Sequence, residues 1–176
     1  MGDIKQKSQY YFVATMLDIV GRSLVASSQV DEKIQQELAK FPVGLVISMN
    51  VFSNELGFFV RVTENKQLEL LSKAEASQHG VDLSVQFKHL KYAFLVLSFQ
   101  ESTAQAFAND RMTVDGNLAY AIRLVRCLNQ LESVILPKAI AIKAVKEYPA
   151  RLELKQKLAI AGKVYFKVAI SYLRKV

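Results

Sequence analysis

The sequence predicts an α/β (α+β) fold: a mainly antiparallel five-stranded sheet with helices on one face and helices at both ends of the chain. Apolar residues recur at helical spacing before residue 42 and again from residue 90, and they alternate with polar residues in between. The chain has 176 residues, of which 51% are apolar and 22% charged. This balance is typical of one packed globular domain and argues against disorder.

Two helices are expected before the sheet. Residues 8–27 carry apolar side chains at helical spacing, and a second helix is expected at 30–41, with Ser28 or Asp31 as its capping residue. We expect residues 1–41 to pack as helices on the domain that follows.

Residues 42–137 are expected to form the sheet and its covering helices. In chain order we expect three strands of a meander, a polar loop, a fourth strand, two helices, a fifth strand and a long helix. Their ranges are 43–51, 56–62, 68–70, 72–80 (the loop), 81–87, 90–99, a short helix from Thr103, 112–114 and 117–136. Turns are expected at Ser53-Asn54, at 64–66 and at Asp115-Gly116.

No catalytic or metal-binding motif is found in the sequence. His79 and His89 have no Cys, Asp or second His at ligand spacing, so we expect surface roles. Cys127, the single cysteine, lies in an apolar helix, which predicts a buried, unreactive thiol and no intrachain disulfide. Asp110 and Asp115 flank the fifth strand, where turn and helix-start roles explain them. We therefore expect a binding protein rather than an enzyme, with no catalytic residue, metal or cofactor.

The start of the chain and its hydropathy bear on localisation. The first fifteen residues lack an apolar stretch followed by a cleavage site, and Gln6 stands where a myristoylation motif has Ser or Thr. No window of 18 residues is both strongly apolar and free of charge. We expect a cytoplasmic protein in a reducing compartment, with peripheral attachment to membranes.

The stretch VDLSVQFKHLKYAFLVLSFQESTAQAFANDRMTVDGNLAYAIRLVRCLNQL, which begins at Val81, resembles the sterol carrier protein family of lipid-transfer domains. In that family a strand leads to a helix, and a short helix precedes a strand, a glycine turn and an apolar helix. Residues 81–87, Phe107, 112–116 and 118–128 occupy those places, and Asn117 replaces the usual acidic residue after the turn. The resemblance extends over 42–139 and is closest in layout to the bacterial ubiquinone-biosynthesis accessory factors that carry this domain.

This resemblance implies helices on one side of the sheet, an apolar tunnel between them, and binding or transfer of a lipid such as a sterol, acyl or prenyl chain. It also implies protein partners in a lipid-metabolic complex. The apolar faces of the predicted strands and helices supply candidate lipid-binding residues: Phe58, Val60, Phe87, Phe94, Leu97, Phe107, Leu118, Ile122 and Val125. The same pattern also fits a filled core, and the alternative function is then a protein-interaction scaffold.

The basic charge lies at the end of the chain. Residues 1–134 hold 13 Lys or Arg and 14 Asp or Glu, whereas 135–176 hold 10 and 2. Residues 138–176 are helical by pattern, divided at Pro149, and from residue 150 we expect a buried apolar face and an opposite basic face. The apolar face is Leu154, Leu158, Tyr165, Val168 and Tyr172, and the basic face, a candidate contact with an anionic membrane, is Lys163, Lys167 and Arg174.

The tail has two other interpretations. The helix can pack on the domain with its charges in water, which the pattern favours equally. Nucleic-acid binding is disfavoured, because the apolar face is too continuous for a solvent-facing surface.

Overall fold

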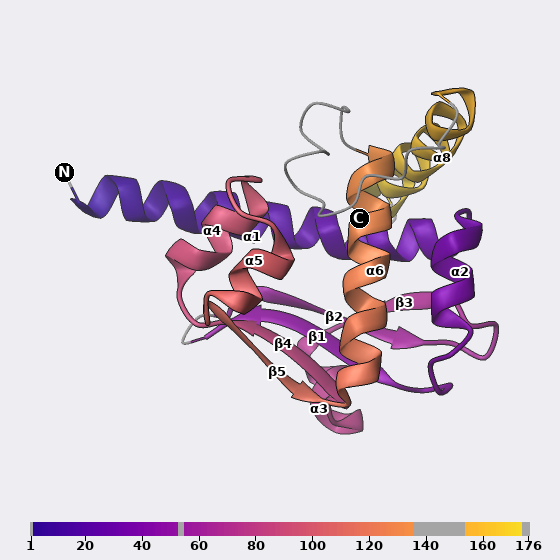
Figure 1. Ribbon diagram of the computed structural model, residues 1–176, viewed down its shortest axis with the longest axis horizontal. Coiled ribbons are helices and arrows are strands. Elements are labelled where there is room, and N and C mark those ends of the chain that lie inside the picture. The colour runs from indigo at the N-terminus through magenta and orange to yellow at the C-terminus, as the bar shows by residue number, and fades with distance from the viewer. Residues whose placement is uncertain (1, 53–54, 136–153, 174–176) are drawn as a thin grey trace.

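The fold is a five-stranded sheet with a layer of helices on one side and a further helix beyond that layer (Figure 1). The computed structural model describes residues 2–52, 55–135 and 154–173. The turn predicted at Ser53-Asn54, the helical pattern of 136–153 with Pro137 and Pro149, and Arg174 lie outside these residues. The strands are β1 (Val46–Val51), β2 (Gly57–Val62), β3 (Leu68–Leu71), β4 (Leu83–Phe87) and β5 (Met112–Gly116).

The sheet is mixed, and the prediction that it is mainly antiparallel was wrong. Its order is β3-β2-β1-β4-β5, and β1 and β4 pair in parallel, with Ile47 opposite Leu83 and Val51 opposite Phe87. The other three pairs are antiparallel. The chain leaves the meander at edge strand β3 and crosses back to pair with β1, and such a crossover connection is what a parallel pair requires.

Most helices lie on one side of the sheet (Figure 1). They are α1 (Gly2–Ser28), α2 (Glu32–Leu38), α4 (Leu90–Leu97), α5 (Thr103–Ala108) and α6 (Leu118–Ile135). Within the described residues the α+β class and the five strands are confirmed, and the predicted helices before and after β5 are present.

Helix α3 (Lys73–His79) corrects the prediction of a polar loop at 72–80 and lies on the opposite side of the sheet (Figure 1). Ser72 caps it: its hydroxyl accepts from the Glu75 amide, and the Glu75 carboxylate accepts from the Ser72 amide. Its one buried side chain, Ala76, packs against Val46 and Leu71 on the outer face of the sheet. A short helix with a single apolar anchor gives no apolar periodicity, which is why it read as a loop.

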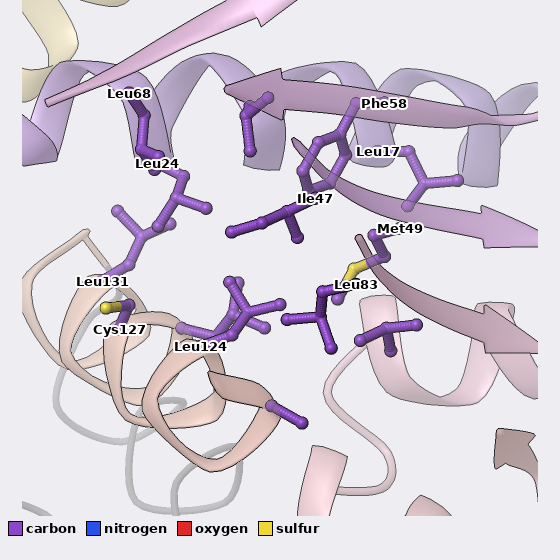
Figure 2. Close-up of a cluster of buried hydrophobic side chains, with 14 of the residues drawn as sticks. Leu17, Leu24, Ile47, Met49, Phe58, Leu68, Leu83, Leu124, Cys127 and Leu131 are labelled. Carbon is purple, nitrogen blue, oxygen red and sulfur yellow. The ribbon is translucent and has the colours of Figure 1, made fainter. Parts of the chain in front are cut away.

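The hydrophobic core fills the space between the sheet, α1 and α6. Figure 2 shows side chains from all three converging there, and the labelled ones are Leu17, Leu24, Ile47, Met49, Phe58, Leu68, Leu83, Leu124, Cys127 and Leu131. Helix α1 comes close to β2 at Gly21, where an added Cβ would lie 2.9 Å from Cγ of Phe58. The N-terminal helix therefore shares one core with the sheet.

Helix α8 (Leu154–Leu173) lies on the side of α1 and α6 that faces away from the sheet (Figure 1). Arg22 of α1 is buried; its guanidinium donates to the Asp18 carboxylate and to the Ser171 carbonyl, and lies 4.3 Å from the centre of the Tyr172 ring. The Tyr172 hydroxyl donates to Asp18 at 2.7 Å. These contacts fix the rotation of α8 about its axis.

The prediction of which face of α8 is buried was partly wrong. Ala161 and Val164 are buried, whereas Leu158 and Tyr165 are exposed. Small side chains allow the helix to approach α1 and α6 closely, so they, rather than the larger apolar residues, occupy the interface. No helix in the described ranges is long and apolar enough to cross a bilayer.

Candidate functional site

An apolar groove opens at the edge of the sheet, between α5, β5 and the first half of α6. Its volume is about 260 Å³, slightly below the range of about 300–1,000 Å³ that is usual for small-molecule sites. Its lining residues are Val85, Thr103, Ala104, Phe107, Met112, Val114, Leu118, Ala121, Ile122, Val125 and Arg126. Three large apolar side chains are left in contact with water there: Phe107, Leu118 and Ile122 are 51%, 60% and 48% exposed. A surface of this kind is suited to an apolar ligand.

Helix α5 forms one wall of the groove, and a capping box fixes the residue at which this helix begins. The Ser102 hydroxyl accepts from the Gln105 amide, and the Gln105 side chain accepts from the Ser102 amide, so both ends of a capping box are present. The helix ends after one and a half turns, where Asp110 adopts a positive φ of 56°. Lys88 pairs with Asp110, and Arg111 with Glu101, which ties this wall to β4 and β5.

Helix α6 forms the other wall and begins directly after β5. Gly116 has a φ of 118°, and a Cβ there would collide with the backbone carbonyl of Asp82, so this position requires glycine. Asn117 then caps the helix by accepting from the Ala119 amide at 2.8 Å. The turn predicted at Asp115-Gly116 was placed too early: both residues belong to β5 and pair with Ser84 and Leu83, so the chain turns after them, at Asn117.

The nine predicted lipid-binding residues divide between this groove and the core. Phe107, Leu118, Ile122 and Val125 line the groove together. Phe58, Val60, Phe87 and Leu97 are buried in the core, where Phe58 packs on α1 at Gly21. Phe94 is half-buried and meets Phe12 of α1 edge to face, with ring centres 5.2 Å apart. The nine residues therefore lie partly at an open groove and partly in the buried core, and the described residues do not show the predicted tunnel.

Seven lining residues were not among the predicted set. The alternation that predicted the fourth and fifth strands already placed Val85, Met112 and Val114 on one face, and their shared face was the available signal. Ala104 and Ala121 are small residues that shape the walls rather than fill them. Nothing in the sequence pattern distinguishes such residues from ordinary helix-forming alanines.

The polar members of the lining are Thr103, which is buried, and Arg126, which is exposed. The Arg126 guanidinium lies 3.4 Å from Oε1 of Glu37 in α2, whereas Arg123 takes Oε2 at 2.9 Å. Arg126 therefore holds the weaker of the two contacts and places a cation at one end of an apolar surface.

The titratable groups on α6 do not form a reactive set. Cys127 is buried, as predicted, and desolvation raises the pKa of its thiol to about 12. Burial raises the pKa of Glu132 to about 8, and its Oε2 has no hydrogen-bond partner. Among the described residues no three His, Cys, Asp or Glu side chains are grouped as a metal site.

The three predicted membrane-contact residues are placed differently. Lys163 of α8 is exposed. Lys167 is half-buried and donates to Oε1 of Gln29 at the end of α1, at 2.7 Å. Arg174 lies outside the described residues. The predicted basic face is thus turned partly toward the body of the molecule.

Comparison with known proteins gives similarity in structure. No protein-family model matches the chain, and no curated protein matches it either. Among solved structures, the chain is similar to one described as "UbiJ-SCP2 Ubiquinone synthesis protein", with a TM-score of 0.43 and 14% identity, over 68% of this chain and 94% of that one.

Two further structures are from Aedes aegypti. Sterol carrier protein 2-like 2 gives a TM-score of 0.32 and 13% identity over 57% of this chain and 94% of that one. Sterol carrier protein 2-like 3 gives 0.31 and 14% over 59% and 97%. Their names are those of the family that the sequence resembles.

Proposed function

We propose that this chain binds a hydrophobic lipid in the groove between α5, β5 and α6, and carries or presents it without covalent chemistry. The observation that carries the proposal is the exposure of Phe107, Leu118 and Ile122 around one apolar hollow. Covering this surface with an acyl, prenyl or sterol-like group contributes about 0.8 kcal/mol for each methylene buried. We place the lipid in this open groove, because the core between sheet and α1 is occupied by side chains.

Three finer points belong to the same proposal. Arg126 at the end of the groove suits a lipid with an anionic or strongly polar head. The protein serves as an accessory factor in lipid or quinone metabolism, as the sequence resemblance implies, alongside protein partners of that pathway. It attaches peripherally to an anionic membrane, through the surface described in the next subsection.

The test begins with the purified full chain. Native mass spectrometry is expected to show co-purifying lipid, and a fluorescent long-chain fatty acid is expected to bind and to be displaced by unlabelled lipid. In Ile122→Trp the indole occupies the hollow, so we expect binding of the fluorescent fatty acid to weaken about tenfold or more.

Ala119→Trp is the matched control. Ala119 is exposed on the same helix but does not line the groove, so this variant is expected to bind like the wild type. Circular dichroism checks that both variants fold. Equal binding by a folded Ile122→Trp protein would place the lipid elsewhere.

The second candidate is a protein-interaction scaffold, and the packed core favours it. In that case the groove receives apolar side chains of a partner protein. Absence of both co-purifying lipid and fatty-acid binding in the wild type would support this candidate over the first.

A further inference from the structure

The outward face of α8 is apolar. Leu158, Phe166 and Leu173 are 63%, 67% and 74% exposed. The exposed residues Gly162 and Ala169 lie between them, so the five positions follow one another at intervals of four, four, three and four residues. This spacing keeps them in one line along the helix, which we call the α8 stripe.

Contacts on the other side of α8 hold the stripe outward. Ala161 and Val164 are buried against the body, and Lys167 donates to Gln29, the residue that follows α1. The Tyr165 hydroxyl donates to the Ile135 carbonyl at the end of α6, at 2.6 Å. Because these anchors come from both α1 and α6, the helix cannot turn its stripe inward without breaking them.

The charge of α8 helps to decide between two partners for the stripe, a second copy of the chain and an anionic membrane. From Leu154 to Leu173 the sequence contains four lysines and no acidic residue. Lys163 is exposed and lies one turn from Phe166 along the helix. A second copy of the chain would bring two such helices face to face, each with Lys163 exposed beside its stripe and no acidic residue to pair with it, which like-charge repulsion disfavours. An apolar line with an exposed lysine beside it, on a helix without acidic residues, matches an anionic bilayer, where the apolar side chains enter the acyl region and the Lys163 ammonium group meets lipid phosphates.

We propose that the α8 stripe docks on an anionic membrane. In this arrangement the apolar line enters the bilayer and the anchored side of the helix stays on the protein, so the helix need not leave the body of the molecule. The groove lies about 20 Å away along α6, measured from Ile122 to Ile135 at 1.5 Å per residue. Docking at the stripe therefore leaves the groove uncovered, and it is expected whether or not the groove binds lipid.

Gly162 allows a matched test, because a Cβ at this position would meet nothing within 4 Å. Gly162→Ala adds a methyl group to the stripe, and Gly162→Glu adds a carboxylate at the same place. The readout is co-sedimentation of the full chain with vesicles of phosphatidylcholine alone or mixed with phosphatidylglycerol. We expect wild type and Gly162→Ala to bind the anionic vesicles at low salt and to be released at high salt.

Gly162→Glu is expected to bind the anionic vesicles about tenfold more weakly than Gly162→Ala. Val81→Glu controls for net charge, because Val81 is exposed and lies in the connection between α3 and β4 rather than on α8. It is expected to bind like the wild type. Equal losses in both acidic variants, or no loss in either, would overturn the proposal. The proposal would also be overturned if the wild type did not bind the vesicles and instead formed a dimer that Gly162→Glu dissociates.

A second measurement uses tryptophan fluorescence to report whether the α8 stripe enters the bilayer. The chain contains no tryptophan, so Phe166→Trp and Val81→Trp each carry a single indole. We expect the emission of Phe166→Trp to shift to the blue on anionic vesicles and that of Val81→Trp to stay unchanged. A shift in both, or in neither while the protein pellets, would show that another surface touches the membrane.

Discussion

Helix α6 has two apolar sides, one buried in the core and one partly exposed to solvent. One side, with Leu124, Leu128 and Leu131, is buried under the sheet and α1. The other, with Leu118 and Ile122, borders the groove and is half exposed. The difference comes from what lies opposite: α1 has 27 residues and packs over the core, whereas α5 has six residues and β5 is an edge strand. An apolar face becomes a binding surface where its neighbour is too short to cover it.

The largest expected effect is a difference in stability between two alanine variants, one on each side of α6. Leu124→Ala leaves a cavity in the core and is expected to lower the free energy of unfolding by about 2–5 kcal/mol. Ile122→Ala, two residues away, is expected to cost less than about 1 kcal/mol, because its side chain is half in water already. Urea denaturation measures both. Equal costs would mean that the groove is closed in solution.

The pH dependence of stability is expected to report on the carboxyl of Glu132, near the end of α6. Glu132, half-buried near the end of α6, has its pKa raised to about 8, so the folded state holds a proton that the unfolded chain has released above pH 4.5. Stability is therefore expected to fall as pH rises from about 4.5 to 8, by roughly 3–5 kcal/mol. In Glu132→Gln this fall should vanish, which thermal or urea unfolding at pH 5 and pH 8 would show. A wild type with flat stability across this range contradicts the buried, unpartnered carboxyl.

Close packing of α1 on the sheet is tested at Gly21. An added methyl group would press on the Phe58 ring, so Gly21→Ala is expected to destabilise the protein by about 1–3 kcal/mol. Gly162→Ala in α8 is the control, since its Cβ enters open space, and it should stabilise the helix by up to about 1 kcal/mol. Opposite signs in chemical denaturation confirm the difference.

The smallest effect is expected at the end of the groove. Arg126→Met removes an exposed ion pair with a separation of 3.4 Å, so the free energy of unfolding should change by less than about 1 kcal/mol. Binding of an anionic fatty acid should weaken more than binding of the corresponding neutral alcohol. If both ligands weaken equally, Arg126 shapes the groove without contacting the head group.

Local structure was largely predictable from the sequence. The alternation around Val85 indicated β4, and the helical spacing after residue 117 indicated α6, because both features depend on neighbouring residues; the turn itself was predicted at Asp115-Gly116, which β5 includes. The helix α3 was also readable, since Ser72 and Glu75 stand at capping-box spacing, although the prediction gave a loop.

Partners that are distant in the chain were not predictable in the same way. A period of two marks β1 and β4 as strands, but it does not say that Ile47 pairs with Leu83 in parallel. Apolar periodicity likewise did not separate Phe58, which packs on α1, from Ile122, which borders the groove. For α8, the buried face depended on Arg22 and Asp18 of α1, and no pattern within the tail contains that information.

The parallel pairing of β1 with β4 also sets the order in which the protein forms on the ribosome. β1, β2 and β3 are contiguous and can pair as they emerge, but the second edge of β1 waits for a strand 36 residues further along the chain. At about 5–20 residues per second, that edge stays open for about 2–7 s during synthesis. Its apolar strand residues, Val46, Ile47, Met49 and Val51, make this interval the one in which a nascent chain is most exposed to strand pairing with another.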